Sequence, residues 1–220
     1  RKYSIDFYGR PLTLEVGKMA ELCNAAVLVR YGETTVLVTA TASPRPKEGV
    51  DYFPLSVDFE EKLYAVGRIP GSFMRREGRP SLQAVLAGRM IDRPMRPLFP
   101  DDLRNDVAIM CTVLSVDRDC SPEIAAMIGA SAAVSISDIP WNGPIAGVVL
   151  GWDGKKYLFN PTQKERETNQ MTVTVACTRQ KVVMIEATAN QIPEDIMLNG
   201  IVKAHETVMP VLDLIDKMVA

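Results

Sequence analysis

Apolar and polar positions alternate along residues 1–60 with the period of two that is typical of half-buried β-strands. Valine and threonine are frequent in these runs, and both suit a pleated surface. Short segments that contain glycine or proline separate the runs and mark turns. The pattern predicts strands at residues 2–7, 12–16, 25–29, 35–41 and 55–59, with turns at 8–11 and 31–34 and a loop at 44–49.

The middle of the chain changes to the longer period of a helix. Residues 82–91 are predicted to form a helix that Pro94 and Pro97 end, because proline lacks the amide proton that a helix needs. A mostly apolar strand follows at residues 106–116.

A second helix is predicted from Ser121 to Ser137. Ser121 is a suitable cap residue, Pro122 stands at the first helical position and Glu123 places an acid in the first turn. Many alanines and glycines follow, and such small side chains let a helix lie close against a sheet.

Three further strands are predicted at residues 145–151, 171–177 and 181–186, and a helix from 193 to 220. One apolar stripe runs along this last helix and predicts core packing, whereas Pro210 is expected to kink or break it. With no internal repeat or low-complexity linker, we expect residues 1–220 to form a single α+β domain in which helices pack on a mixed β-sheet.

The composition excludes several classes of protein and site. Of the residues, 47% are hydrophobic, but no run approaches the roughly eighteen apolar residues of a membrane span, and the first residues lack the apolar centre of a signal peptide. The four cysteines are scattered and only one histidine exists, so we expect no zinc site and buried thiols in a reducing cytosol. His205 is expected on an exposed helix face, without a catalytic role.

Residues 68–96 carry a strong local positive charge. They contain seven arginines and two acidic residues, a net charge of +5, whereas the whole chain carries −2. No lysine is among them. Since the planar guanidinium binds phosphate oxygens through two bonds and stacks on bases, this choice favours phosphate or nucleic-acid binding.

Within this segment, glycine and proline flank residues 67–80 and mark a loop with Phe73 and Met74 at its tip. An aromatic side chain beside Arg75 and Arg76 is the combination that holds single-stranded nucleic acid, because the ring stacks on a base while the cations bind phosphates. The alternative is that Phe73 and Met74 anchor the loop in the core and the arginines form salt bridges.

The strings Gly67–Pro80, Ile91–Pro100, Met127–Ala133 and Asn160–Gln163 together resemble the first RNase PH-like domain of the polynucleotide phosphorylases. The likeness extends along the whole chain. It implies an RNase PH-like fold (ribosomal protein S5 domain 2-like) and a cytoplasmic homotrimer in which six such domains surround a pore, with RNA-degradation machinery as a further possible partner. It also implies that a helical segment, a second RNase PH-like domain and KH and S1 domains would follow in the complete protein.

The reaction of the family is phosphorolysis of RNA from its 3' end, in which phosphate releases nucleoside diphosphates with the help of Mg²⁺. By the resemblance, the phosphate-binding turn falls on residues 120–123, and the two aspartates that hold the metal fall on Arg166 and Thr172. Glu123 and Arg166 oppose the charges of phosphate and of Mg²⁺, and Thr172 offers only a neutral oxygen. We therefore expect no catalytic residue and no bound metal in this chain, and we expect Mg²⁺ and phosphate to bind in the second domain.

What the resemblance implies instead is an RNA-gripping loop, which guides RNA to the second domain. The expected RNA-binding residues are Phe73, Met74, Arg75, Arg76, Arg79, Arg93 and Arg96. Met74 departs from the aromatic residue that is usual in the family, and Arg79, Arg93 and Arg96 could instead pair with carboxylates at a domain interface. Three alternatives stay open: an active stand-alone RNase PH-type exoribonuclease, an inert structural subunit of the ring, and a nucleotide-binding side activity, for which the sequence shows no P-loop.

Overall fold

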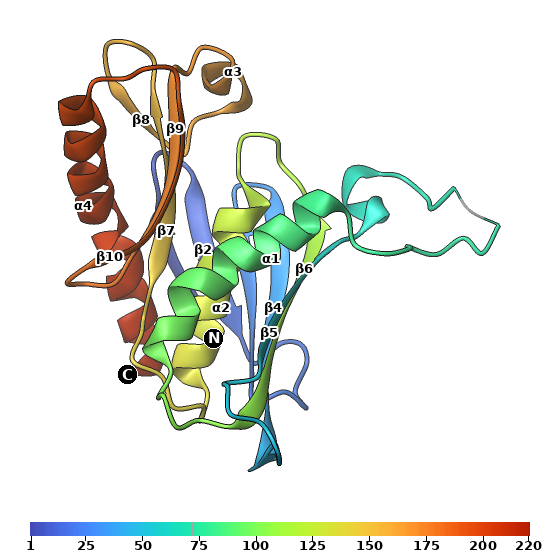
Figure 1. Ribbon diagram of the computed structural model, residues 1–220. Coiled ribbons are helices and arrows are strands. Elements are labelled where there is room, and N and C mark those ends of the chain that lie inside the picture. The colour runs from blue at the N-terminus through green and yellow to red at the C-terminus, as the bar shows by residue number, and fades with distance from the viewer. Residues whose placement is uncertain (72) are drawn as a thin grey trace.

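The computed structural model describes residues 1–71 and 73–220, and within them the chain forms two β-sheets and four α-helices (Figure 1). The larger sheet has six strands in the order β1-β2-β3-β4-β6-β5. Its neighbouring strands are antiparallel except β5 and β6, which are parallel. The strands are β1 (Lys2–Asp6), β2 (Pro11–Val16), β3 (Ala25–Tyr31), β4 (Thr34–Pro46), β5 (Leu55–Glu61) and β6 (Asn105–Ser115).

The second sheet has four antiparallel strands in the order β10-β9-β7-β8. These are β7 (Ala146–Trp152), β8 (Tyr157–Phe159), β9 (Met171–Cys177) and β10 (Val182–Ala189). The larger sheet has the mixed character that the sequence predicts, and a second, antiparallel sheet stands beside it. The short strand β8 carries too few residues to show a period and is not among the predicted strands.

Helix α2 (Pro122–Ile136) is the most deeply buried element. Its start is as predicted: the amide of Ile124 donates a hydrogen bond to the hydroxyl of Ser121, and Pro122 occupies the first turn. A Cβ on Gly129 would lie 2.6 Å from Val29 and 2.7 Å from Val38, on strands β3 and β4. The helix therefore packs against the larger sheet at a distance that only glycine permits here.

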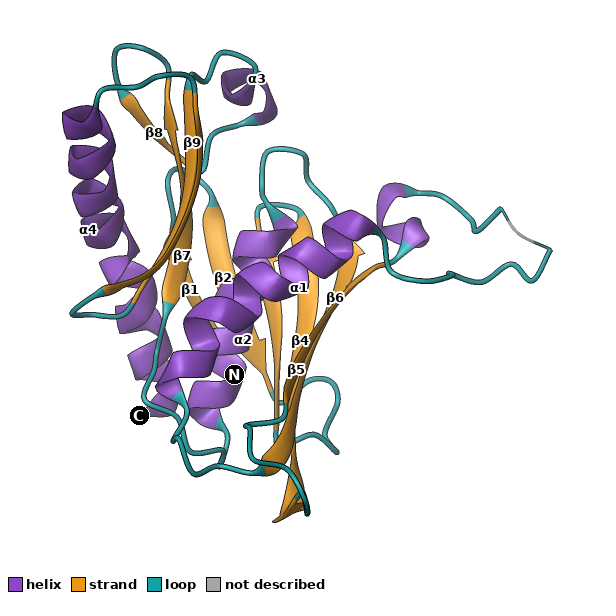
Figure 2. Ribbon diagram, viewed as in Figure 1, coloured by secondary structure: helices purple, strands orange, loops and turns teal. Residues whose placement is uncertain are grey.

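The other helices cover the sheets from the outside (Figures 1 and 2). Helix α1 (Leu82–Met95) packs along β5, and α4 (Glu194–Val219) packs along β7 and β9. The short elements η1 (Leu63–Val66), η2 (Arg96–Leu98) and α3 (Gln163–Arg166) complete the fold. Among the described residues, no helix is both long enough and apolar enough to cross a membrane.

Proline breaks neither long helix where the sequence predicts it. Helix α1 contains Pro94 in its last turn and continues into η2, helped by Arg96, whose side chain bonds Asp92 one turn earlier. Helix α4 runs unbroken through Pro210, which is exposed on its surface while Val208 and Val211 beside it are buried. The loss of one amide donor is offset by tertiary packing of the apolar face.

The predicted loop at residues 44–49 is also partly wrong, because β4 continues through Pro46. A register irregularity separates Ala42 from Pro46 in the pairing with β6. There the hydroxyl of Ser43 accepts a hydrogen bond from the amide of Asp106 and donates one to the carbonyl of Arg45. These side-chain bonds keep the strand in place where Pro44 and Pro46 have no amide proton to donate.

Three of the four cysteines are buried as expected, while Cys23 is only half-buried. Burial raises the pKa of Cys111 and Cys177 to about 12, so both thiols are protonated at neutral pH. His205 is half-buried rather than exposed, and its Nε2 lies 3.1 Å from the carbonyl oxygen of Thr178. The histidine thus contacts the turn between β9 and β10.

The close approach of α2 to the larger sheet can be tested by adding one methyl group. Gly129→Ala places a Cβ against Val29 and Val38, so we expect it to lower the free energy of unfolding by about 1–3 kcal/mol, measured by urea denaturation. Gly78→Ala is the matched control, because nothing lies within 4 Å of a Cβ at that glycine. Equal stability of Gly129→Ala and the unaltered chain would contradict the tight packing.

Candidate functional site

A long arm, of which the structure describes residues 67–71 and 73–80, projects from the body of the molecule between η1 and α1 (Figures 1 and 2). At its far end the side chains of Phe73 and Met74 are 99% and 68% exposed. The alternative in which these two residues anchor the loop in the core is therefore wrong. Adjacent apolar side chains with this much exposure are typical of a surface that binds a partner.

The arginines of the arm are equally exposed. Arg68, Arg75, Arg76 and Arg79 form no ion pair within residues 1–71 and 73–220, so their charges are free to meet an anion. The backbone of Arg75 has a φ of 50°, which turns the chain at the tip of the arm.

Two further predicted residues follow the arm: Arg93 lies in the last turn of α1 and Arg96 begins η2. Arg93 is exposed and has no ion-pair partner in the described part of the chain. Arg96 differs, because its guanidinium binds Asp92 at 2.7 Å and donates to the carbonyls of Phe53 and Leu55 at 3.1 Å. These bonds tie the end of α1 to the start of β5, so Arg96 has a structural role in the folded domain.

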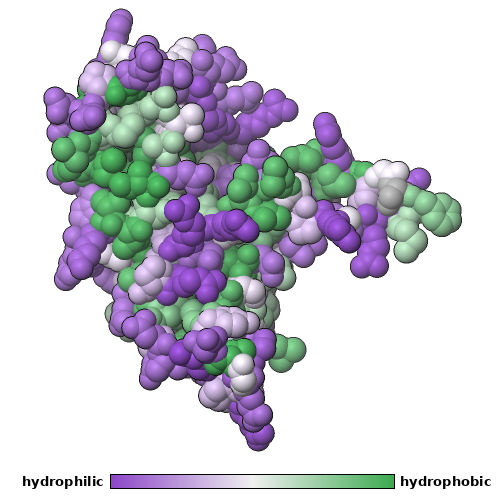
Figure 3. Space-filling view, in the orientation of Figure 1, coloured by the Kyte–Doolittle hydropathy of each residue, from purple (hydrophilic) through white to green (hydrophobic). Residues whose placement is uncertain are grey.

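Apolar side chains extend from the arm onto α1, where Leu82, Val85 and Leu86 are 75%, 45% and 50% exposed. Figure 3 shows these hydrophobic surfaces along the helix and at the arm. The arm and the outer face of α1 therefore offer both cations and apolar area.

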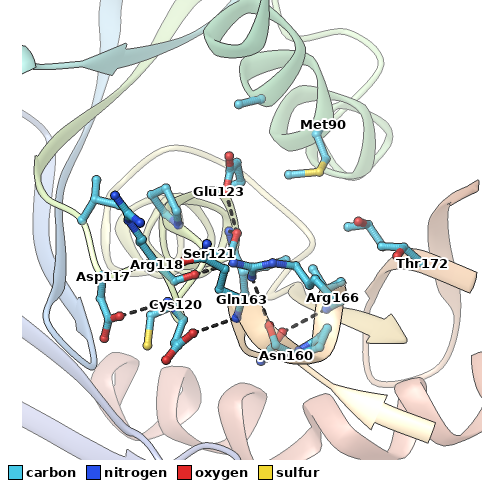
Figure 4. A pocket seen from close by; sticks show the side chains of 18 of the residues that line it. Met90, Asp117, Arg118, Cys120, Ser121, Glu123, Asn160, Gln163, Arg166 and Thr172 are labelled. Carbon is cyan, nitrogen blue, oxygen red and sulfur yellow. Dashed lines mark hydrogen bonds between the residues drawn. The ribbon is translucent and has the colours of Figure 1, made fainter. Parts of the chain in front are cut away.

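A pocket of about 750 Å³ lies between α1, the start of α2 and strand β9 (Figure 4). Glu123, Arg166 and Thr172, which the family resemblance places at the phosphate and metal positions, all line it. The structure thus brings together three residues that lie up to 49 positions apart in sequence. A volume of this size is in the range of small-molecule sites.

The rim of this pocket is held in place by Arg10, which reaches it from the turn between β1 and β2. Its guanidinium donates to the carbonyls of Asp119 and Asn160 and lies 5.1 Å from the centre of the Tyr31 ring. The hydroxyl of Tyr31 in turn accepts from the side-chain amide of Asn160. Burial raises the pKa of Tyr31 to about 12, so its hydroxyl stays neutral.

The acids of the rim mostly bind backbone amides. Asp117 accepts from the amide of Asp119 at 2.9 Å, and this bond is the main reason that the pKa of Asp117 lies below its usual value. Asp119 accepts from the amide of Gln163 at 2.7 Å, at the start of α3. These carboxylates shape the rim and are held in place by hydrogen bonds from backbone amides.

The residues present fit neither phosphate nor Mg²⁺. Pro122 removes a donor at the start of α2, and the carboxylate of Glu123 lies in the field that would attract an anion. Arg166 is bound to the carbonyls of Pro161 and Arg118, and a cation repels a metal ion. Within the described residues, no group of three histidine, cysteine or acidic side chains could hold a metal.

Sequence reasoning does not find the contribution of Arg10 or of Arg118, which also lines the pocket. Arg10 lies in a turn and Arg118 stands between two aspartates, and nothing in the local pattern distinguishes either arginine from a solvated surface residue. Only the family resemblance points to this part of the chain, through residues 120–123, 166 and 172.

Family models match the chain in two parts: residues 8–140 match "3' exoribonuclease family, domain 1", and residues 143–207 match "3' exoribonuclease family, domain 2". The crystal structure of rice (Oryza sativa) Rrp46 is similar in fold, with a TM-score of 0.75 over 96% of this chain and 95% of that chain. Its sequence identity is 13%, so this likeness concerns the fold alone. It confirms the expected α+β, RNase PH-like fold.

Curated relatives are much more similar in sequence. The polyribonucleotide nucleotidyltransferase of Ruminiclostridium cellulolyticum is 55% identical over all of this chain, and that of Clostridioides difficile is 48% identical over 99% of it. The chain spans about a third of the length of these relatives, at 31% of each. Because the domain 1 model alone matches more than half of its residues, the chain belongs to the 3' exoribonuclease (RNase PH) family.

Proposed function

We propose that residues 1–220 are one RNase PH-like domain, the first of a polyribonucleotide nucleotidyltransferase, and that this domain holds RNA without catalysing its cleavage. The high identity to enzymes of that name supports the assignment. The observation that carries the RNA-holding role is the projecting arm, whose exposed Phe73, Arg75 and Arg76 have no internal partner among the described residues.

The arm has the chemistry that single-stranded RNA requires. The ring of Phe73 stacks on a base, the thioether of Met74 packs beside it, and Arg75 and Arg76 bind the adjacent phosphates. Neither kind of contact depends on the identity of the base, so this grip is independent of RNA sequence.

The other arginines are expected to contribute to RNA binding according to whether other groups of the chain already bind their guanidinium groups. Arg79 and Arg93 have no ion-pair partner in the described residues and extend the positive surface from the arm to α1. Arg96 contributes least to RNA binding, because Asp92 and two backbone carbonyls already bind its guanidinium.

The catalytic step belongs elsewhere in the complete enzyme. In phosphorolysis, inorganic phosphate attacks the terminal 3' linkage of RNA and a nucleoside diphosphate leaves. With Glu123, Arg166 and Thr172 at the corresponding positions, this domain binds neither the attacking phosphate nor Mg²⁺. Both would bind in the second RNase PH-like domain of the longer protein.

The complete protein would be a cytoplasmic homotrimer in which this domain builds half of the ring, with RNA-degradation machinery as a further partner. The apolar face of α1 and its exposed arginines are available for contacts between domains as well as for RNA. These statements rest on the family resemblance and on the similarity to polyribonucleotide nucleotidyltransferases.

Removing the Phe73 ring, which stacks on a base, and the Arg75 cation should weaken RNA binding. For Phe73→Ala with Arg75→Ala, we expect the Kd for a short oligo(A) to rise roughly 10-fold to 100-fold, because one base stack contributes about 1–3 kcal/mol. The slope of log K against log salt should fall in magnitude by about 0.7 for the lost phosphate contact. Fluorescence anisotropy over a salt series measures both quantities.

The matched control is Tyr52→Ala with Arg45→Ala, which removes an exposed aromatic ring and an exposed arginine outside the arm. This variant should bind RNA as the unaltered chain does. If the arm variant binds as well as the control, the arm does not hold RNA and the arginines serve assembly of the ring.

The absence of catalysis can be measured directly with this chain. Incubated with oligo(A), inorganic phosphate and Mg²⁺, it should bind the RNA and release no ADP above the level of a protein-free control. ADP release that follows the protein through purification and disappears in Arg166→Ala would show an active stand-alone exoribonuclease instead, with its site in the pocket.

A further inference from the structure

The pocket beside α2 is well formed although it suits neither phosphate nor metal. Leu86 and Met90 of α1 form one wall, and Val116, Pro122 and Val149 form the other sides. Figure 4 shows Met90, Glu123 and Thr172 around the same open space. Apolar walls with a few polar groups are the usual composition of a site for a small organic molecule.

The polar groups of the pocket fall into two sets. Asp117, Asp119 and Arg166 are bound to backbone groups of the chain, as described above. Glu123 and Arg118 are not: Glu123 accepts a single hydrogen bond, from the hydroxyl of Ser121 at 2.6 Å, and the guanidinium of Arg118 has no partner in the described residues. Glu123 and Arg118 are therefore available to a ligand. Glu186 of β10 also lines the pocket and forms no hydrogen bond within the described residues, but its side chain is exposed, whereas that of Glu123 is half-buried.

Glu123 decides which part of a ligand enters. Its carboxylate retains free lone pairs, and the bond from Ser121 fixes its orientation. A carboxylate can accept two hydrogen bonds side by side, so it fits a group that presents two adjacent N–H donors. Arg118, exposed on the rim, fits an anionic group that stays outside the pocket.

We propose that this pocket binds a guanine base, whose N1–H and 2-amino groups donate to Glu123 while the sugar and phosphate remain at the rim beside Arg118. Guanine is the RNA base with two adjacent donors on its Watson–Crick edge. Adenine and cytosine place a ring acceptor beside their amino group, and uracil places carbonyl oxygens beside its N–H, so each would turn an acceptor toward the carboxylate. The apolar walls enclose the base as they do in sites that hold an unstacked nucleotide.

The base could belong to a free nucleotide or to an RNA chain, and both present the same chemistry to Glu123. Either source is independent of the arm, so Phe73→Ala with Arg75→Ala should leave binding of guanosine monophosphate unchanged. A failure of RNA holding by the arm and a failure of this pocket would therefore be seen separately.

Calorimetric titration of the unaltered chain with GMP, IMP and UMP provides the test. IMP lacks only the 2-amino group, so we expect it to bind about tenfold more weakly than GMP, with UMP weaker still. In Glu123→Gln the affinity for GMP should fall about tenfold and the preference over IMP should vanish, because an amide offers one acceptor instead of two. Glu194→Gln, a change of the same kind in the first turn of α4, is the matched control.

Two short RNAs identify the source of the base, oligo(A) and the same oligo(A) ending in guanosine, both measured with the arm variant. GMP binding that depends on Glu123 supports a free nucleotide. A preference for the guanosine-ended RNA that depends on Glu123, without GMP binding, supports an RNA end. The proposal is overturned if GMP and IMP bind alike and the two RNAs bind alike, a comparison that needs no folded Glu123 variant.

Discussion

The position of everything else depends on how closely α2 packs between the two sheets. On one side Gly129 allows Val29 and Val38 to approach, and on the other a Cβ at Gly147 of β7 would lie 2.4 Å from the sulfur of Met127. The helix is buried along most of its length, so packing against the two sheets fixes the position of its first turn. The first turn carries Glu123 into the pocket. The packing of α2 therefore determines where the carboxylate of Glu123 lies.

Much of the fold could be predicted because its signals are local. The alternating strands β1 to β3 and the Ser121 cap of α2 depend on residues that are neighbours in sequence. The errors arise where distant contacts outweigh a local rule. Pro94 and Pro210 break no helix because buried neighbours hold the backbone, and the division into two sheets depends on pairings that no period reveals.

The candidate sites differ in the same way. The arm is predictable, since its arginines and Phe73 lie within one short segment and need no partner from elsewhere. The pocket requires Arg10, Asp119 and Asn160 to meet, and Arg10 is separated from each of the other two by more than a hundred positions along the chain. The local sequence around each of these residues carries no signal of a site, so only the folded structure shows that Arg10 holds the rim.

Helix α1 connects the two sites physically. It begins where the arm ends, and Met90 in its third turn forms a wall of the pocket, about 12 Å along the helix axis from Leu82. The base of the arm therefore lies near the pocket, where the carboxylates of Glu123 and Glu186 repel phosphate. The phosphates of an RNA backbone are thus kept out while an uncharged base with paired donors can enter. Glu123, one of the residues that remove phosphate chemistry from this domain, is also the residue that selects a base.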